Sequence, residues 1–341
     1  MRGAREVFGR GRSAYGGGDT GGRRPLRLTA RLLGGLLLLG LSLVLLCRAA
    51  GRDGPTPVPQ LLAFLPWLTA PALLGLLLAA YGRWRAGTGW GVLVVAGLCG
   101  ALLPGATQRA DDPGSGTPLR VLSANVEFGH AAPALVGEVR RTRPDLVLVP
   151  ECPARCVATL RAGLPAWRYV SRAAGEGSAG SLVLSRHPLR PTRPVPAQMT
   201  MPGADMTFAG RTLRVQLAHP KPPLPGLTTV WETELARLAR TAPGVDVMAG
   251  DFNASQDHAA FRTLLAAGPL RDTARTLHRS RVPTWPSRTA PVIGTQIDHV
   301  LYGRRLAARA VRFVRIEGTD HLAVEAELVV RGHTPQGAPA R

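Results

Sequence analysis

The chain has 341 residues, enough for two folding units with a sizeable buried core, and its formal net charge is +20. Such a charge favours a polyanionic partner, whether a phosphate ester, a nucleic acid or an anionic lipid headgroup, without choosing among them. The four cysteines are accompanied by no further Cys or His pair at ligand spacing, which argues against a zinc site.

The first third of the chain is basic and then strongly apolar. Residues 1–27 carry several arginines and a glycine run without apolar periodicity, so we expect a disordered basic tail. Residues 28–107 contain three apolar stretches, at residues 32–47, 58–81 and 90–103. With flanking neutral residues, each approaches the roughly 20 residues that cross a bilayer core. We therefore expect a membrane domain of about three transmembrane helices.

Two alternatives remain for these stretches. A basic lead before an apolar core is also typical of a signal peptide, although the two later stretches weaken that interpretation. One short stretch could instead be re-entrant or interfacial. Arginines in the tail and at Arg83 and Arg85 indicate the cytoplasmic side. Three spans would then make a multi-pass cell-membrane protein whose C-terminal domain lies outside the cytoplasm.

The rest of the chain alternates between short strands and helices. Residues 108–118 are rich in Gly, Pro and Asp and should form a linker, and residues 331–341 a disordered tail. Between them, β-rich runs occur at residues 119–128, 145–149, 181–184, 212–217, 245–249, 297–302 and 323–330. Helical segments occur at residues 133–141, 154–162, 231–240 and 257–265. This pattern predicts an α/β or α+β domain over residues 119–330, with a site at its strand ends.

Polar side chains concentrate at the ends of the apolar runs. They are Asn125, Glu151, Asp251, Asn253, Asp298 and Asp320. Each alone is more often a turn or capping residue, but their repetition over five strands indicates a shared site. Carboxylate and amide oxygens without cysteine suit Mg²⁺ or Mn²⁺ rather than zinc. His219 and His321 could add proton transfer or hydrogen bonds to a phosphoryl oxygen.

Six segments follow one another in a fixed order. They are SANV at 123–126, RPDLVLVPE at 143–151, GSLVLSR at 180–186, GDFNA at 250–254, QIDHV at 296–300 and GTDH at 318–321. Together they resemble the endonuclease/exonuclease/phosphatase family, including its members with an N-terminal membrane segment. The resemblance covers residues 119–328, and the succession of GDFN, IDHV and DH is its most specific part. It implies a four-layer sandwich of two packed β-sheets flanked by helices, with the site at one edge.

The resemblance also implies roles for the acidic and amide residues. Glu151, Asn125 and Asp320 would hold or orient the metal. Asp251 and Asn253 would position the attacking water and the scissile phosphate.

Roles for the two histidines follow from the same resemblance. His321, held in orientation by Asp298, would contact the phosphate or exchange a proton. His219 would stabilise the phosphoryl oxygens, and Glu176 is the nearest candidate for its partner.

We therefore expect a membrane-anchored, metal-dependent phosphoesterase that hydrolyses a phosphodiester in a nuclease-like reaction through metal-activated water. A lipid or headgroup phosphodiesterase of the same fold is the first alternative, because no interleaved aromatic platform for stacking bases is visible in the sequence. A non-catalytic, membrane-tethered binding module is the second, and the oxygen-rich strand ends argue against it. The partners are the phosphate ester and the lipid bilayer; no obligate protein partner is evident.

Other residues leave alternatives open. Cys152 and Cys156 could form a short disulfide if the domain is exported, and the sequence does not decide this. Trp285 either shapes one wall of the cleft or packs in the core. Asp257 and His258 are expected to be solvated or capping residues.

Overall fold

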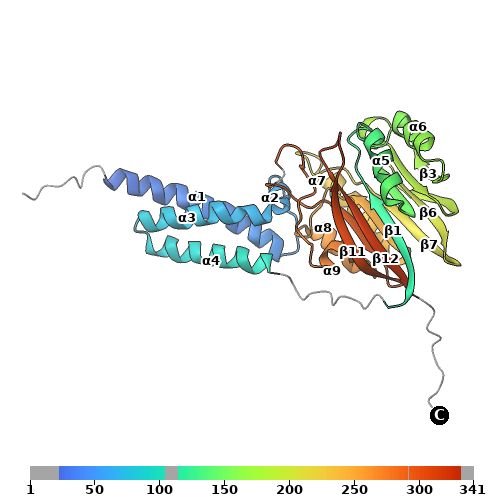
Figure 1. The fold of residues 1–341 in the computed structure, drawn as a ribbon. Helices are drawn as coiled ribbons and strands as arrows, with labels where there is room; N and C mark the ends of the chain where they lie inside the picture. Colours follow the sequence, from blue (N-terminus) through green and yellow to red (C-terminus); the bar gives the residue numbers. More distant parts are fainter. Residues whose placement is uncertain (1–22, 104–113, 291, 332–341) are drawn as a thin grey trace, which may run out of the picture.

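The computed structural model describes residues 23–103, 114–290 and 292–331. A bundle of helices projects from one end of an α/β sandwich (Figure 1). Most residues of the two predicted tails and of the predicted linker lie outside the described residues. Within the described part, helix α1 (Arg23–Ala49) begins inside the predicted N-terminal tail, and strand β1 (Gly116–Ser123) begins inside the predicted linker.

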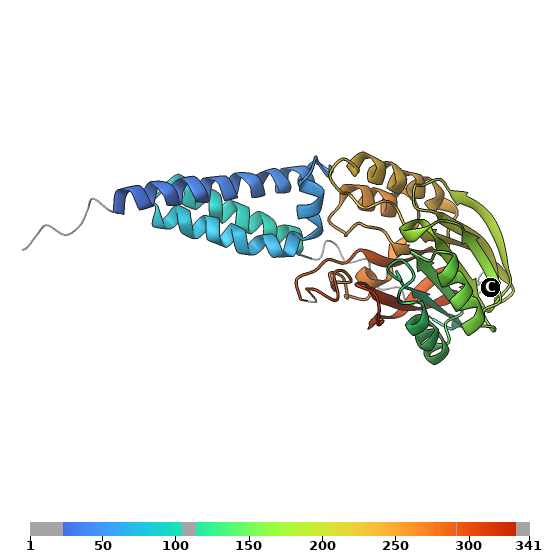
Figure 2. The ribbon, with the colours of Figure 1, turned by 90° about the horizontal axis from the view of Figure 1, so that it is seen from above.

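The bundle consists of α1, α3 (Thr69–Tyr81) and α4 (Arg85–Leu102), which run side by side away from the sandwich (Figure 2). Two short helices, α2 (Val58–Ala63) and η1 (Leu65–Leu68), connect α1 to α3 at the end next to the sandwich. Leu38, Leu65 and Leu98 are fully buried between the helices. The outer face is also apolar: Leu36 of α1 and Leu77 of α3 are 67% and 65% exposed.

Two of the three expected spans are long enough to cross a membrane by length and composition, namely Arg24–Ala49 and Arg85–Leu102. The expected middle span, residues 58–81, is instead divided into α2, η1 and α3. Prolines occupy the first turns of α2 and η1, where the missing N–H is tolerated and a new helix can begin. The continuous apolar helix that remains there, Leu65–Tyr81, is shorter.

The sandwich contains two six-stranded sheets. The first has the order β11-β12-β1-β2-β4-β3, and its further strands are β2 (Leu146–Pro150), β3 (Tyr169–Ala173), β4 (Ser181–Ser185), β11 (Leu306–Arg315) and β12 (Leu322–Arg331). The second has the order β5-β6-β7-β8-β10-β9, with β5 (Leu189–Val195), β6 (Met201–Phe208), β7 (Arg211–Ala218), β8 (Val247–Asp251), β9 (Arg271–Asp272) and β10 (Asp298–Tyr302).

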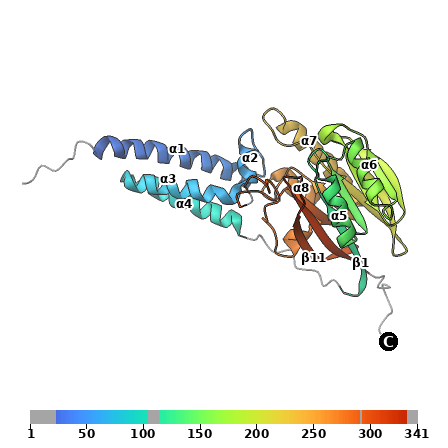
Figure 3. The ribbon, with the colours of Figure 1, turned by 45° about the horizontal axis from the view of Figure 1, so that its top comes forward.

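Helices cover the outer faces of both sheets. α5 (Ala132–Thr142) and α6 (Ala154–Gly163) pack on the first sheet (Figure 3). α7 (Thr228–Thr241) and α8 (Ala259–Ala267) pack on the second, and the short α9 (Thr273–Thr276) follows β9. The sheets bury Leu148, Val215 and Val300 between them. The predicted four-layer sandwich is therefore confirmed.

All seven expected strands are present, but five others were not expected: β3, β5, β6, β9 and β11. β5 contains Pro191 and Pro194 and is largely exposed, as suits an edge strand, so it lacks the apolar pattern of an interior one. The first expected strand was also too long, since β1 ends at Ser123. Glu127 and Phe128 have φ values of 43° and 56°, which are incompatible with a continued strand.

Candidate functional site

The polar strand-end residues converge at one end of the sandwich. Asn125 follows β1, Glu151 follows β2, Asp251 ends β8, Asp298 begins β10, and His321 precedes β12. Asp251 and Asp298 are direct partners in the antiparallel pairing of β8 with β10, so their side chains lie on the same face. β7 and β8 approach closely at Gly250, where a Cβ would lie 1.9 Å from the carbonyl oxygen of Ala218.

Asn125 connects two of the carboxylates. Its Nδ2 donates to Glu151 Oε1 at 3.2 Å and to Asp251 Oδ2 at 3.1 Å. Its Oδ1 accepts from the backbone N–H of Glu127 at 3.0 Å. The backbone N–H of Phe128 donates to the other oxygen of Glu151 at 2.9 Å. Asn125 thus acts as a donor here, which fits orienting the carboxylates better than offering an oxygen to a cation.

Asp298 and His321 form a buried pair. His321 Nδ1 lies 2.9 Å from Asp298 Oδ2, and Nε2 lies 3.8 Å from Asp251 Oδ2. The hydroxyl of Thr284 accepts from the backbone N–H of Asp298, and that of Thr319 accepts from the backbone N–H of His321. The pair is thereby held from both sides.

Burial and neighbouring charges shift the pKa values of His321 and Asp251. Burial opposes the charge on His321, but the carboxylates of Asp298 and Asp251 outweigh it and raise the pKa of His321 to about 10. Burial, followed by repulsion from Asp298, raises the pKa of Asp251 to about 7. At neutral pH the site therefore holds an imidazolium beside a carboxyl group that can exchange a proton.

Asn253 and His219 lie beside this pair. Asn253 has a left-handed φ of 48°, its backbone N–H donates to Asp251 Oδ1 at 2.8 Å, and its side chain donates to the carbonyl of Pro220 at 3.0 Å. His219 is fully buried, and neither ring nitrogen has a hydrogen-bond partner among the described residues, so the expected pairing with Glu176 is absent there. Burial, with the charges of His321 and Lys221, lowers the pKa of His219 to about 3.

One group of three side chains among the described residues could hold a cation. Oxygen and nitrogen atoms of Asp251, Asp298 and His321 lie within 4.8 Å of one another. In this group, His321 Nδ1 already contacts Asp298 Oδ2 at 2.9 Å. Glu151 and Asp320, which the sequence predicts as ligands, offer further carboxylates in the same cleft. Trp285 Nε1 donates to Asp320 Oδ2 at 2.9 Å, so Trp285 supports the site rather than only packing in the core.

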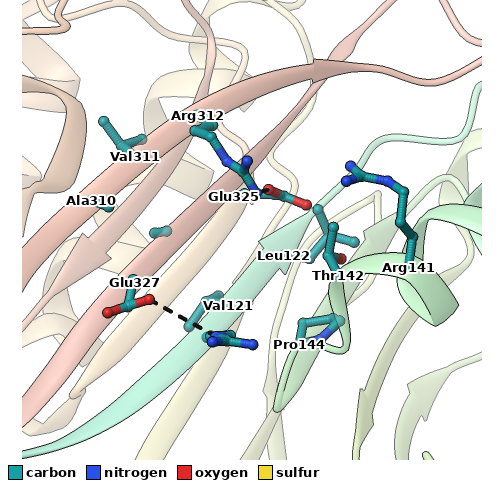
Figure 4. A pocket seen from close by; sticks show the side chains of 12 residues that line it. Val121, Leu122, Arg141, Thr142, Pro144, Ala310, Val311, Arg312, Glu325 and Glu327 are labelled. Atoms are coloured by element: carbon teal, nitrogen blue, oxygen red, sulfur yellow. Dashed lines mark hydrogen bonds and ion pairs between the residues drawn. The ribbon is translucent and has the colours of Figure 1, made fainter.

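Glu151, Asp251, Asn253, Asp320 and His321 line a cleft of about 500 Å³, and Asn125, Asp298 and His219 lie behind its lining. Glu127, Glu151, Asp251 and Asp320 contribute carboxyl groups to it, and Lys221 is the one lysine or arginine among its described lining residues. Unexpectedly, the α2 segment, residues 58–64, also lines the cleft through Gln60, Ala63 and Phe64. Another hollow lies between α5 and the strands β1, β11 and β12 (Figure 4). Its charged side chains pair with one another, as in Arg312 with Glu325, and it contains none of the predicted site residues.

A disulfide adjoins the site. Cys152 and Cys156 are bonded, with an S–S distance of 1.98 Å, and both are buried. Cys152 directly follows Glu151, whose φ of 56° turns the chain sharply at the end of β2. The bridge therefore closes the loop that presents the Glu151 carboxylate.

Comparison with known proteins agrees with this arrangement. The sequence model of the endonuclease/exonuclease/phosphatase family matches residues 122–321, more than half of the chain. The chain belongs to this family. Members hydrolyse phosphate esters, so the expected class of enzyme is confirmed. None of the curated proteins matches.

Solved structures similar to this family member share its fold at low identity. A humanised TDP2 from D. rerio matches with a TM-score of 0.52 and 15% identity, covering 62% of this chain and 98% of that one. A family protein from Bacteroides vulgatus matches with a TM-score of 0.51 and 14% identity, covering 63% and 100%. One from Beutenbergia cavernae matches with a TM-score of 0.50 and 20% identity, covering 63% and 72%.

The sequence did not predict the supporting contacts in the site of this family member. Thr284 and Thr319 act through single hydroxyl groups, and Phe128 acts through its backbone. The α2 segment was hidden inside an expected membrane span. The Thr284-Trp285-Pro286 sequence and the GTDH segment at 318–321 gave a signal beforehand, but not the contacts that these side chains make.

Proposed function

We propose that the protein hydrolyses a phosphate diester with water and a divalent cation, Mg²⁺ or Mn²⁺, at the outer surface of a membrane that it spans. One observation carries the proposal: carboxyl and amide groups from separate strand ends share one cleft with His321, whose imidazole contacts Asp298. A phosphodiester is an anion, and such a cleft would repel it unless a cation offset the carboxylates.

The chemistry of the donor set fits a hard cation. Glu151 and Asp320 would hold it, and Asn125 would orient Glu151 through the amide contact described above. When bound, the cation supplies positive charge that offsets the developing charge on the phosphoryl and leaving oxygens.

The protein's own side chains would handle the protons. The oxygen of water forms the new bond to phosphorus, Asp251 accepts the water's proton, and the P–O bond to the leaving group breaks. His321, held by Asp298, donates a hydrogen bond to a phosphoryl oxygen and can give its proton to the leaving oxygen. Asn253 would position the phosphate, and His219 would stabilise the phosphoryl oxygens if the cleft opened to it.

Three features support a membrane anchor with the enzyme outside. Exposed leucines on α1 and α3 leave the bundle with an apolar outer face. Arginines in the N-terminal tail and in the loop after α3 mark the cytoplasmic side. The Cys152–Cys156 disulfide suits an oxidising compartment. The protein would then be a multi-pass protein of the cell membrane.

A second candidate substrate is nucleic acid. One similar structure is of D. rerio TDP2 with a single-stranded DNA product, at 14% identity and a TM-score of 0.51. A non-catalytic binding module is disfavoured, because the Asp298–His321 pair is costly to bury and its imidazole lines the cleft.

Hydrolysis of bis(4-nitrophenyl) phosphate by the purified full chain tests the proposal. We expect turnover with Mg²⁺ or Mn²⁺ and none after chelation, and Glu151→Gln should need a much higher cation concentration. Arg120→Gln, in the separate hollow of Figure 4, is the matched control. Turnover that is indifferent to chelation would refute the role of the cation.

A further inference from the structure

We propose that the substrate is an amphiphile: a phosphate diester with a long apolar chain, which lies against the α2 segment while its phosphate reaches the catalytic carboxyl groups. The inference rests on the proposed hydrolysis and names the class of substrate. The α2 segment here means residues 58–64, from Val58 to Phe64.

The cleft is lined by two chemically different sets of side chains. One set comprises the carboxyl groups and His321. The other set is apolar: Ala63, Phe64, Phe128, Met199, Leu224 and Ile297. The ring of Phe64 lies 6.4 Å from that of Trp285, which itself donates to Asp320, so Phe64 lies next to the catalytic carboxyl groups. A ligand that fills the cleft therefore meets both charged groups and apolar side chains.

The α2 segment is fixed to the sandwich by buried polar contacts. Both carboxylate oxygens of Asp53, just before it, accept from the first backbone N–H groups of α8, those of Ala259 and Ala260, at 2.7 and 2.9 Å. His258 Nε2 lies 2.8 Å from the carbonyl oxygen of Pro59. Gln60 donates to the carbonyl of Pro223. These contacts hold the α2 segment, and with it Phe64, against the sandwich.

A second anchor joins the ends of the bundle helices to the sandwich. Arg48, in the last turn of α1, lies 3.0 Å from the Asp257 carboxylate, which Arg281 also contacts. Asp257 and His258, expected to be solvated or capping residues, are instead buried in this junction. The bundle consequently cannot swing away from the cleft without breaking a buried ion pair.

Exposed apolar side chains lie near the cleft. Leu224, which lines it, is 51% exposed. Val292 and Ile293, which precede the lining residue Thr295 in the chain, are 72% and 55% exposed. Trp67 of η1 donates to the carbonyl of Gly294 at 3.1 Å, which ties this part of the chain to the end of the bundle. If the bundle spans a bilayer, these apolar side chains lie at the surface of that bilayer, where an apolar chain can pass into the cleft.

A polynucleotide fits the same surface poorly. It needs a row of cations along its backbone. Among the lining residues that the structure describes, Lys221 faces four carboxyl groups. Arg288, near the mouth, is already paired with Glu127 at 2.8 Å.

A pair of esters with the same scissile bond tests the proposal. Methyl 4-nitrophenyl phosphate and octyl 4-nitrophenyl phosphate both release 4-nitrophenolate, and only the alkyl chain differs. The full chain, in maltoside micelles with Mg²⁺, should have a kcat/KM at least about tenfold higher for the octyl ester, because the extra methylene groups are buried. The ratio should fall towards one in Phe64→Ala. It should persist in Leu77→Ala, a matched loss of an exposed apolar side chain on the bundle.

The possible outcomes distinguish the proposed hydrolysis from the proposed class of substrate. If neither ester is hydrolysed, the proposed function fails and the inference fails with it. If both esters are hydrolysed at equal kcat/KM, or if Phe64→Ala retains the octyl preference, the proposed hydrolysis stands and the proposal of an amphiphilic substrate is wrong. A single-stranded oligonucleotide with a higher kcat/KM than the octyl ester would also overturn the inference. Partitioning into micelles affects the three proteins equally, so the difference between variants isolates the cleft.

Discussion

Asp298 lies directly opposite Asp251 across β10 and β8, and the imidazole of His321 contacts Asp298 at 2.9 Å while approaching Asp251 at 3.8 Å. Two carboxyl groups on facing positions of neighbouring strands repel each other. The imidazolium offsets this repulsion, and its attraction to the two carboxylates, which outweighs burial, raises the pKa of His321. The strand register therefore fixes both the orientation and the charge of His321.

Asp298→Asn should lower kcat about 10²- to 10⁴-fold while the protein stays folded, because an amide neither holds the imidazole equally well nor favours its charge. Steady-state kinetics with circular dichroism checks this. Asp272→Asn is the matched control: Asp272 lies 2.8 Å from His299 in another buried pair, outside the cleft. That variant should lose stability with little change in kcat. Equal losses of kcat in both variants would contradict the assigned role of Asp298.

Gly250→Ala should prevent correct folding. Gly250 has a φ of 150°, and an added Cβ would lie 1.9 Å from the carbonyl oxygen of Ala218 in the neighbouring strand. Gly137→Ala is the control, because Gly137 in α5 has open space around it. It should stabilise the protein by about 0.5–1 kcal/mol through helix propensity. Thermal unfolding measures both, and a cooperative Gly250→Ala transition near that of the wild type would contradict the prediction.

The candidate site residues could be predicted from the sequence because each lies at or near the end of an apolar strand. Strand ends meet at one edge of a sheet, so Asn125, Glu151 and Asp251 were placed together without knowledge of the register. The direct pairing of Asp251 with Asp298 could not be predicted, since a shift of one residue would turn the side chain to the opposite face.

The contribution of the bundle to the cleft could not be predicted either. Residues 58–81 are predominantly apolar, which is equally typical of a membrane span and of a buried wall. Phe64 differs from its apolar neighbours only in its tertiary surroundings, which bring it within 6.4 Å of Trp285. The ion pair of Asp257 with Arg48 could not be predicted either, because nothing in the sequence distinguishes these two residues from other charged residues.

Loss of the Cys152–Cys156 disulfide should weaken cation binding as well as stability. The bridge closes a very short loop, for which the chain-entropy argument gives ~2 kcal/mol. Since Glu151 directly precedes Cys152, freeing this loop should raise the Mg²⁺ concentration that gives half-maximal rate. The double variant Cys152→Ala/Cys156→Ala tests this by Mg²⁺ titration of the rate. Cys47→Ala, at a free cysteine, is the control. An unchanged Mg²⁺ requirement in the double variant would separate the bridge from the site.

Mild acid should loosen the junction between the bundle and the sandwich. His258 is fully buried, its Nδ1 accepts from the backbone N–H of Ser255 at 2.8 Å, and its Nε2 contacts the carbonyl oxygen of Pro59. Burial lowers the pKa of His258, although the nearby carboxylates of Asp53 and Asp257 act in the opposite direction. A histidine with a lowered pKa in the folded state contributes stability above its unfolded value of about 6.5, and that contribution is lost as pH falls below it.

Hydrogen exchange of α2 and α8 between pH 7.5 and pH 5 measures this loosening. In the wild type, exchange at the lower pH should increase beyond the intrinsic dependence of amide exchange on pH. His258→Gln, which cannot take up a proton, should remove most of that increase. The exposed His130→Gln should retain it. Because α2 carries Phe64, the same acidification should reduce the octyl-over-methyl preference in the wild type more than in His258→Gln. An identical response in both proteins would mean that other groups control the junction.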